Sequence, residues 1–540
     1  MNDPVHSLAL MPIVLPLVSA AILLAIGDKR RWLRSLVNIL ATLAGLAIAV
    51  LLLRAVDEGR IIVYLASNWA APFGIVLVVD RLSALMLLMV GLLAAGAAVY
   101  AEAGWARAGA YFHPLFQIHL LGLNGAFLTG DLFNLFVFFE VLLAASYGLQ
   151  LHGSGWTRVR SGMHYLAANL LASLMFLVGL AILYGIVGTL NMADLAQKLA
   201  AVPEHDRGLL HVGTAILAIA FLVKAAIWPL NAWLVPAYAA AAAPVAALFV
   251  LMTKMGVYAL VRLWTLIYSA EAGVSAYFGS GVLVAGGLVT LAFGAFGLLA
   301  SIRLERIAAA SILVSSGTLL AALGLDSVAL GGAALYYLAS ATLAGGALFL
   351  LVELAKRTSI EGGAQPALVE DVVDEDDNLD DQQLPLVGRA VPVPVAMLGL
   401  AFIACALLVA GLPPLWGFLA KLALMRAAVD AAAGVPIAAW SLVVLLLLSS
   451  LFATATLVRA GIRHFWSKGG RIAPRIKAAE SIAVVFLLLA CVLLTVFAEP
   501  ALRYADRTAA SLQAPQAYVD AVLGSRARLG QIEDLPAVAP

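Results

Sequence analysis

Four ionisable side chains lie inside segments that are otherwise apolar enough to cross a membrane. They are Glu140, Lys224, Lys254 and Lys421. A charge in the middle of a bilayer costs at least about 2.5 to 3.5 kcal/mol on insertion scales, so carboxylates and amines at that depth usually line ion or proton pathways. The chain offers one such carboxylate and three amines, without the clustered oxygen ligands that a desolvated sodium ion needs. These residues therefore predict a proton relay.

Glu140 and Lys224 have the residue types of a proton switch. A desolvated amine holds its proton weakly, and a nearby carboxylate strengthens that hold. Moving the carboxylate by a few ångströms would therefore load or unload a proton on the amine. The alternative is a static buried ion pair that only sets helix packing. One sequence leaves open whether the two side chains touch.

Lys254 and Lys421 extend this series of amines. Lys254 follows Lys224 by 30 residues across a short connection. We therefore expect these two amines on neighbouring antiparallel helices at comparable depth, where water could pass a proton between them. The alternative for Lys254 and Lys421 is that the amine snorkels to the membrane interface. That alternative is weaker for Lys254, which lies about 13 Å into its helix at 1.5 Å per residue.

Histidines and helix-start acids add weaker signals. Three histidines in or near apolar segments could extend a proton path to water, although a satisfied core or interfacial role is the simpler explanation for each one. These are His113, His119 and His164. Three acids stand at expected helix starts, where capping of free backbone amides accounts for them. These are Asp80, Asp131 and Asp194.

The composition is that of a polytopic membrane protein. Of the 540 residues, 64% are hydrophobic and only 12% are charged, far from the composition of soluble domains. A net charge of +1 excludes a broad basic face for nucleic acid. Cys405 and Cys491 lie in apolar runs and offer neither a disulfide framework nor a metal cluster. No cofactor motif stands out, so we expect neither a cofactor nor a metal.

Apolar runs predict an all-α fold with about 14 transmembrane helices. The first run, Leu8 to Gly27, is too long for the apolar core of a signal peptide, is followed by basic residues and shows no cleavage site, so we expect it to be the first span. The expected spans are approximately 8–27, 36–54, 81–101, 112–129, 131–151, 162–187, 211–238, 242–266, 277–300, 307–325, 330–354, 392–429, 437–459 and 480–498.

The seventh and twelfth of these spans are too long for one crossing and carry prolines in their interiors. Pro229 lies in the seventh, and Pro413 and Pro414 lie in the twelfth. A proline inside a helix removes a backbone hydrogen bond, and membranes tolerate the break only where protein or water satisfies the freed groups. Paired breaks of this kind occur at corresponding positions of internal repeats, near the ion path. We therefore expect two five-helix repeats, helices four to eight and helices nine to thirteen.

These repeats divide the chain into four parts. We expect N-terminal helices over 1–111, a first repeat over 112–266, a second repeat over 277–459 that includes an acidic loop at 359–388, and a last helix with a tail over 480–540. The acidic loop carries nine Asp and Glu and no Lys or Arg. Such blocks are normally solvated, with cation attraction or partner binding as the alternative.

The distribution of basic residues predicts the orientation. If the N-terminus is outside, the cytoplasmic loops hold 18 of the 32 Lys and Arg, and the opposite loops and tail hold eight. Cytoplasmic loops are enriched in these residues. We therefore expect both termini on the outside, in agreement with an even number of spans.

Several separate motifs appear in the order typical of one family. They are TGDLFNLFVFFEVLLAASYGLQLHG (129–153), GTLNMADLA (188–196), FLVKAAIWPLNAWLVPAYAAAAAPVAALF (221–249), TKMGVYALVR (253–262) and GLPPLWGFLAK (411–421). The chain resembles the antiporter-like proteins shared by Mrp-type multisubunit cation/proton antiporters and the proton-pumping arm of respiratory complex I. The run FNLFVFFEVLLAASYGL and the expected 14 helices resemble the D subunit of the Mrp-type (Pha or Mnh) antiporters in particular.

The resemblance implies two inverted five-helix bundles with broken helices seven and twelve. It also implies that Glu140 is the ion-pair carboxylate, Lys224 its partner amine, Lys254 the relay and Lys421 the terminal lysine near the exit. Helices ten and eleven lack the histidines of many relatives, and helix eleven also lacks the lysine of complex I homologues. Hydroxyl side chains with water would have to carry protons through this half. The candidates are Ser311, Ser315, Ser316, Ser340 and Thr342.

The resemblance implies the proton-translocating subunit of a monovalent cation (Na⁺ or K⁺)/proton antiporter. Such a subunit is a secondary transporter, not an enzyme, and lies in the inner (plasma) membrane with other membrane subunits as partners. The alternative is a pump subunit of a complex I-like or hydrogenase-type redox assembly that uses the same relay. A third reading is a scaffold that transports nothing. The sequence leaves open which cation is exchanged and whether its route lies in this chain.

Overall fold

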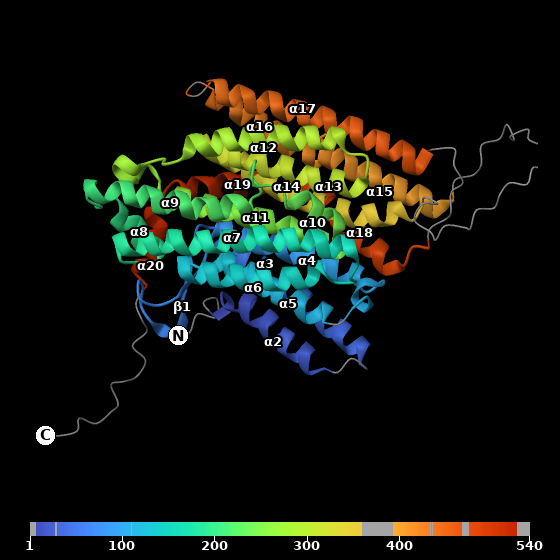
Figure 1. Cartoon of the computed structure of the whole chain (residues 1–540), viewed down its shortest axis with the longest axis horizontal. Coiled ribbons are helices and arrows are strands. Elements are labelled where there is room, and N and C mark those ends of the chain that lie inside the picture. Colours follow the sequence, from blue (N-terminus) through green and yellow to red (C-terminus); the bar gives the residue numbers. More distant parts are fainter. Residues whose placement is uncertain are drawn as a thin grey trace, which may run out of the picture.

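Long helices lying side by side form almost the whole molecule (Figure 1). The computed structural model describes residues 7–26, 30–109, 111–358, 392–432, 434, 436–466 and 475–525. The acidic loop at 359–388 lies outside the described residues. The helices are α2 (Met11–Ala25), α3 (Arg31–Val56), α4 (Arg81–Ala101), α5 (Phe112–Leu128), α6 (Leu132–Gln150), α7 (Trp156–Val187), α8 (Met192–Leu199), α9 (Glu204–Lys224), α10 (Leu234–Ala240), α11 (Ala243–Ile267), α12 (Ser280–Ala300), α13 (Leu304–Gly324), α14 (Val328–Lys356), α15 (Val393–Ala410), α16 (Trp416–Ala431), α17 (Pro436–Gly461), α18 (Ala478–Val496), α19 (Ala498–Leu512) and α20 (Gln516–Leu523).

Each of the 14 expected spans contains at least one of these helices, and the expected all-helical membrane fold is confirmed. Twelve described helices are long and apolar enough to cross a membrane. Among the other expected spans are α2, with 15 residues, and α5, with 17. The sequence analysis missed a short antiparallel hairpin of β1 (Ile62–Leu65) and β2 (Val76–Val79), which pairs Ile62 with Val79 between α3 and α4.

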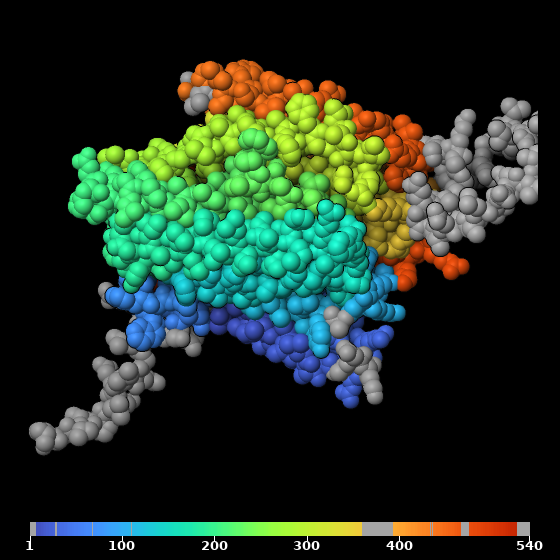
Figure 2. Space-filling view, viewed as in Figure 1, coloured from blue at the N-terminus to red at the C-terminus, as the bar shows by residue number. Residues whose placement is uncertain are grey.

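Four helices form the interior of the bundle. The buried share of the apolar stretch is 94% in α11, 89% in α13 and in α14, and 83% in α4. In the other long apolar helices it is 28 to 50%, so these helices expose a face to their surroundings. Figure 2 shows the N-terminal segments on one flank and α17 on the opposite flank. Lys254, in the middle of α11, is therefore enclosed by protein.

Glycines allow the closest helix contacts. A Cβ atom on Gly287 of α12 would lie 2.3 Å from the backbone nitrogen of Ala321, and one on Gly317 of α13 would lie 2.3 Å from that of Leu291. No side chain fits at such distances, so α12 and α13 touch backbone to backbone. Small residues serve the same purpose at helix contacts in other membrane proteins, where the hydrophobic effect does not drive helices together.

Both helix interruptions expected from the prolines are present. The seventh expected span divides into α9 and α10, with Pro229 between them, and the twelfth divides into α15 and α16, with Pro413 and Pro414 between them. Hydroxyl groups of neighbouring helices satisfy freed backbone amides. The amide of Trp228 donates to Thr290 Oγ1 at 2.8 Å, and that of Trp416 donates to Thr495 Oγ1 at 2.9 Å. The breaks therefore follow the rule that irregular backbone in a membrane must be satisfied by protein.

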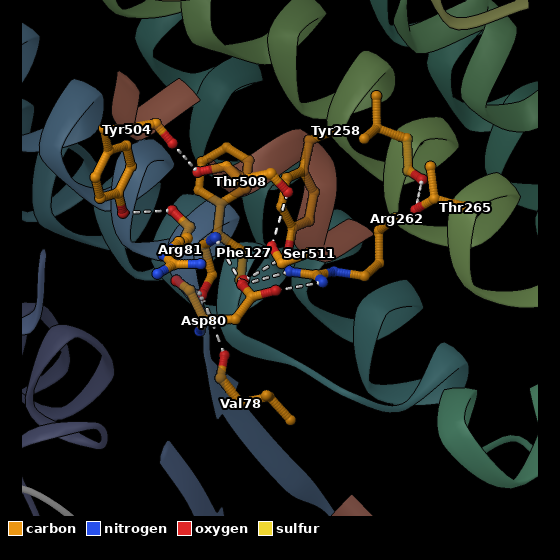
Figure 3. A network of polar contacts seen from close by, with 12 residues as sticks. Val78, Asp80, Arg81, Phe127, Tyr258, Arg262, Thr265, Tyr504, Thr508 and Ser511 are labelled. Carbon is orange, nitrogen blue, oxygen red and sulfur yellow. Dashed lines mark hydrogen bonds and ion pairs between the residues drawn. The ribbon is translucent and has the colours of Figure 1, made fainter. Parts of the chain in front are cut away.

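A polar network joins α4, α11 and the C-terminal helices at one end of the bundle (Figure 3). Asp80 caps α4 by accepting from the Ser83 amide at 2.9 Å, as expected for a helix-start acid. Its carboxylate also accepts a hydrogen bond from each terminal nitrogen of Arg262 on α11, at 2.6 and 2.7 Å. Tyr504 of α19 donates to the backbone oxygen of Arg81 at 2.8 Å. The described part of the tail, residues 500–525, therefore packs on this chain's own helices.

The other two helix-start acids behave differently from each other. Asp131 caps α6 by accepting from the amide of Asn134 at 2.9 Å, as expected. Asp194 is not the cap of α8, because Asn191 occupies that position and accepts from the Asp194 amide at 3.2 Å. Asp194 instead lies in the first turn and accepts from Lys198 at 2.8 Å. The capping prediction for Asp194 is therefore wrong by one turn.

Replacing Asp80 with Asn should destabilise the protein by roughly 3 to 5 kcal/mol, because it leaves the buried charge of Arg262 without its partner. Burial alone raises the pKa of Asp80, but Arg262 and Ser83 outweigh burial and hold that pKa below its ordinary value. The stabilisation is therefore complete at neutral pH and is lost on acidification below about pH 4. Thermal unfolding in detergent across pH measures both effects. An Asn variant as stable as the wild type at pH 7 would contradict this account.

Candidate functional site

Glu140 and Lys224 lie near each other but not in direct contact. Glu140 is on α6, and its Oε1 is buried without a hydrogen-bond partner among the described residues. It interacts electrostatically with Lys224, the last residue of α9. The described side chains of this pair do not come within the 4.0 Å of an ion pair. The carboxylate is therefore placed to influence the amine without neutralising it by direct contact.

The end of α9 supplies a favourable place for the Lys224 amine. Carbonyl groups at a helix C-terminus carry partial negative charge and favour a cation. The amine nitrogen also lies 4.8 Å from the centre of the Phe139 ring, within the range of a cation–π interaction. Phe139 directly precedes Glu140 in α6. A shift of α6 would therefore change both contacts of Lys224 together.

Lys224 and Lys254 lie on touching helices at similar depth, as expected. A Cβ atom on Gly256 of α11 would be 2.9 Å from the carbonyl carbon of Lys224 and 2.5 Å from the amide nitrogen of Ala225. Gly256 is two residues from Lys254, so the backbones that carry the two lysines are in contact. The glycine makes this approach possible, because any other residue would force the broken end of α9 away.

Lys254 connects the first set of helices to the second. Its side chain is fully buried, and its Nζ donates to Ser315 Oγ of α13 at 2.5 Å. Ser315 Oγ in turn donates to the backbone oxygen of Ile312 at 2.9 Å. Snorkelling to the interface is therefore excluded for this lysine. Ser315 was one of five hydroxyl candidates in the sequence, and the structure selects it as the one in contact with an amine.

A small polar cavity lies between Ser315 and Lys421. Its volume is about 20 Å³, enough for about one water molecule. Polar residues from four helices line it. They are Ser311 and Ser315 of α13, Tyr337 and Ser340 of α14, Lys421 of α16 and Ser449 of α17. The cavity therefore brings the hydroxyl of Ser315, which holds Lys254, to the same space as the amine of Lys421.

Neutral oxygens hold the Lys421 amine at the second helix break. Its Nζ donates to the backbone oxygens of Val409 and Ala410 at 3.2 and 3.0 Å, and to Ser450 Oγ at 2.8 Å. Val409 and Ala410 are the last residues of α15. The interruption of the helix thus creates the acceptors that Lys421 uses. Its exposed fraction is 4%, so the amine does not snorkel to water.

Not every expected path residue joins this line. Ser316 and Thr342 are buried but do not line the cavity, and Thr342 donates within its own helix to Leu338. His119 is fully buried, lies against the Phe249 ring of α11, and has no hydrogen-bond partner on either ring nitrogen among the described residues. His164 lies on an exposed face of α7. It is therefore outside the group of buried polar residues.

The sequence analysis missed three members of the line. Tyr337, Ser449 and Ser450 are polar groups at or beside the cavity. The adjacent serines in the apolar run LVVLLLLSSLF were a usable signal, because two hydroxyls within a span need partners inside the protein. Tyr337 was a weaker signal of a polar cavity, since a tyrosine in an apolar run is common in helix packing.

Comparison with known proteins identifies the family. Residues 129–451 match the family described as NADH:quinone oxidoreductase/Mrp antiporter, transmembrane. This chain belongs to that family. It is 49% identical to the D subunit of a probable K⁺/H⁺ antiporter of Rhizobium meliloti (strain 1021), over 97% of this chain and 99% of that protein. It is 32% identical to the D subunit of a Na⁺/H⁺ antiporter of Bacillus subtilis (strain 168), over 96% and 99%.

Solved structures share the fold. The chain superposes with a TM-score of 0.83 and 28% identity on a chain of the Mrp complex from Dietzia sp. DQ12-45-1b, covering 97% of this chain and all of that one. The TM-score is 0.80, at 24% identity, for a chain of an archaeal membrane-bound sulfane sulfur reductase, with 96% and 100% covered. The resemblance to the D subunit of Mrp antiporters, inferred from motifs, is confirmed. This chain is an antiporter subunit, a transporter rather than an enzyme.

Replacing Ser315 with Ala should slow proton movement through the protein by at least about tenfold, because a hydrogen bond to a charged group is worth roughly 1.5 to 3 kcal/mol. Ser316→Ala is the matched control, since the adjacent hydroxyl is buried but lines no part of the cavity. Proton flux into vesicles that contain the assembled protein is the measurement. Equal flux in the two variants would remove Ser315 from the path.

Proposed function

We propose that this chain is the proton-translocating membrane subunit of a multisubunit monovalent cation (Na⁺ or K⁺)/proton antiporter. One observation carries the proposal: a line of buried groups runs from Glu140 and Lys224 through Lys254 and Ser315 to the cavity at Lys421. Buried amines of this kind are costly in a bilayer and usually mark ion or proton paths. Family membership and the relatives that are D subunits of antiporters support the same function.

The proposed switch is the distance between Glu140 and Lys224. When α6 brings the carboxylate toward the amine, Lys224 binds a proton, and when the carboxylate withdraws, the amine passes the proton on. Two features favour such a movement. Glu140 has an unsatisfied buried oxygen among the described residues, and Lys224 contacts the neutral ring of Phe139. A locked bidentate pair, such as Asp80 with Arg262, would resist this displacement.

The proposed path then crosses to the second half of the protein. Lys224 and Lys254 exchange a proton across the contact of α9 with α11. Lys254 passes it to Ser315, and a water in the cavity carries it to Lys421. Ser311 and Ser340 line the same cavity and assist this transfer. We assign no role in this path to His119, His164, Ser316 or Thr342.

The proposed architecture is that of 14 spans with two inverted five-helix repeats. The repeats are α5 to α11 and α12 to α17, within the expected ranges 112–266 and 277–459. Helix pairs correspond in order: α5 packs on α6 as α12 packs on α13, and the broken α9–α10 packs on α7 as the broken α15–α16 packs on α14. Each break has a lysine beside it, Lys224 in one repeat and Lys421 in the other.

We propose that partner membrane subunits complete the antiporter, as in the solved Mrp complex that contains a similar chain. The relative at 49% identity is named for K⁺ and the one at 32% for Na⁺, so K⁺ is the first cation to test. The runner-up is a proton-pumping subunit of a complex I-like or hydrogenase-type redox assembly. The structural likeness to the reductase and to complex I, at 24 and 22% identity, supports the shared fold.

Glu140→Ala or Lys224→Ala should reduce cation/proton exchange by roughly 100-fold or more, because the proton donor or acceptor of the switch is lost. Assembly should survive, since a small side chain fits both sites. Lys198→Ala is the matched control, because Lys198 is half exposed and pairs with Asp194 at the surface of α8. Exchange is measured in vesicles with assembly checked on native gels. Normal exchange by an assembled Glu140→Ala complex would refute the relay.

This chain reconstituted alone should not exchange K⁺ or Na⁺ for protons. The described residues contain buried amines in line but no cluster of oxygen ligands suited to a bare cation. Activity should return with the partner subunits and should need no electron donor. Cation uptake driven by a pH gradient into liposomes with this chain alone would overturn the partnership. Transport by the whole assembly that stopped without an electron donor would favour the redox runner-up.

Arg107 should face the cytoplasm and Glu204 the outside, with both termini outside. Both positions are exposed ends of the helix bundle, and the Lys and Arg bias gives the orientation. Single cysteines at these positions, with the buried Cys405 and Cys491 replaced by Ala, are treated with an impermeant thiol reagent in intact cells. We expect labelling at position 204 only. Labelling at position 107 without permeabilisation would invert the topology.

A further inference from the structure

A large cavity opens at the end of the bundle where α3 and α5 begin. Its volume is about 790 Å³, far above the 20 Å³ of the cavity beside Lys421. It lies between the first turns of α3 and α5 and the segment that follows α4. The proton path described above does not pass through it. This cavity has room for a ligand much larger than water.

The described lining of this cavity is positively charged. Arg31, Arg34 and Arg107 contribute guanidinium groups, and Glu102 is the one acidic residue among the described lining residues. The Glu102 carboxyl is engaged by a hydrogen bond from Ser35 and by the charge of Arg107, and burial raises its pKa. Arg31 and Arg107 against one partly engaged acid leave positive charge in excess among the described lining residues. The cavity therefore favours an anion.

Two helix starts add to this preference. The cap positions of α3 and α5, Arg30 and Tyr111, make no side-chain cap hydrogen bond. The first backbone amides of both helices thus lack the usual side-chain acceptor, and helix N-termini attract anions, phosphate above all. His113 lines the cavity with an exposed fraction of only 7%, and its Nδ1 has no hydrogen-bond partner among the described residues. An acceptor from a ligand would satisfy this nitrogen.

The remaining lining is arranged as a membrane interface. Trp32 and Tyr111 lie at the rim, with exposed fractions of 70% and 56%. Tryptophan and tyrosine collect where the lipid headgroups lie. Leu36 and Ile39 line the cavity one and two turns further along α3, toward the hydrocarbon. The cavity is thus basic and aromatic near the two helix starts, and its lining becomes apolar further along α3.

We propose that this cavity binds the phosphate group of an anionic phospholipid, with an acyl chain along Leu36 and Ile39. Arg31 and Arg107 pair with the phosphate, and His113 Nδ1 donates a hydrogen bond to it. Inorganic phosphate shares the headgroup chemistry but does not use the apolar lining at Leu36 and Ile39. The inference rests on the membrane fold and is independent of the proposed proton path.

The test uses the complete assembly in phosphatidylcholine vesicles that contain a photoactivatable phosphatidylglycerol. After irradiation, mass spectrometry maps lipid adducts to peptides of this chain. We expect adducts on 30–39 and 102–113 in the wild type, and about 30-fold fewer in Arg31→Gln/Arg107→Gln. The control Arg54→Gln/Arg503→Gln removes two exposed charges at the opposite end and should leave these adducts unchanged. Equal adduct yields in both double variants overturn the proposal.

A second arm separates the two sources of phosphate. In vesicles without anionic lipid, inorganic phosphate is added at millimolar concentration, and modification of His113 by a histidine reagent is measured. Strong protection in this arm, without lipid adducts in the first, assigns the site to free phosphate and overturns the lipid. Lipid adducts with little protection by phosphate support the proposal. A photoreactive residue at Tyr111 that links to a partner subunit in place of lipid also overturns it. Equal unfolding temperatures of the variants in detergent establish that the substitutions leave the fold intact.

Discussion

The cost of placing an amine in hydrocarbon governs the architecture of this protein. Each buried lysine needs a partner that the bilayer does not provide, and the three lysines find three different ones. Lys224 uses the end of α9 and the Phe139 ring, Lys254 uses Ser315, and Lys421 uses the end of α15 with Ser450. These partners are neutral, so each amine is held without being fixed by a full countercharge. Small movements of the helices therefore change how firmly each amine keeps a proton.

The helix breaks follow from the same cost. Inside an intact helix the backbone amides and carbonyls bond mainly to each other, and only the groups at its ends lack a helical partner. Ending α15 at Ala410 frees the carbonyls that Lys421 takes, and ending α9 at Lys224 places that residue at the negative end of a helix. The amides freed by the same breaks donate hydrogen bonds to Thr290 and Thr495 of neighbouring helices. The breaks thus provide the backbone groups that hold the lysines, and the amides they free are hydrogen-bonded within the protein.

The two ends of the bundle are built differently from its middle. At one end, Asp80 and Arg262 form a bidentate pair that Tyr258 and the C-terminal helices enclose. At the other, Arg357 joins Glu353 and Glu480, and Trp105 donates to Glu353, which ties α14 to α18 and to the segment after α4. Full charges in close pairs hold geometry firmly. Rigid ends and a middle held by neutral contacts suit a protein whose interior groups shift over small distances.

The sequence by itself determined the membrane class, the positions of the spans, the two breaks and the four ionisable residues that lie within them. These features depend on local properties: runs of apolar residues, prolines inside them, and charges that hydrocarbon rejects. Only the tertiary structure decided which groups meet. Ser315 holds Lys254 while the adjacent Ser316 does not, His164 faces outward, and Arg262 is the partner of Asp80 from a helix far along the chain. Adjacent residues of a helix point about 100° apart at 3.6 residues per turn, and the rotation of each helix is set by its contacts with neighbours, which hydropathy does not encode.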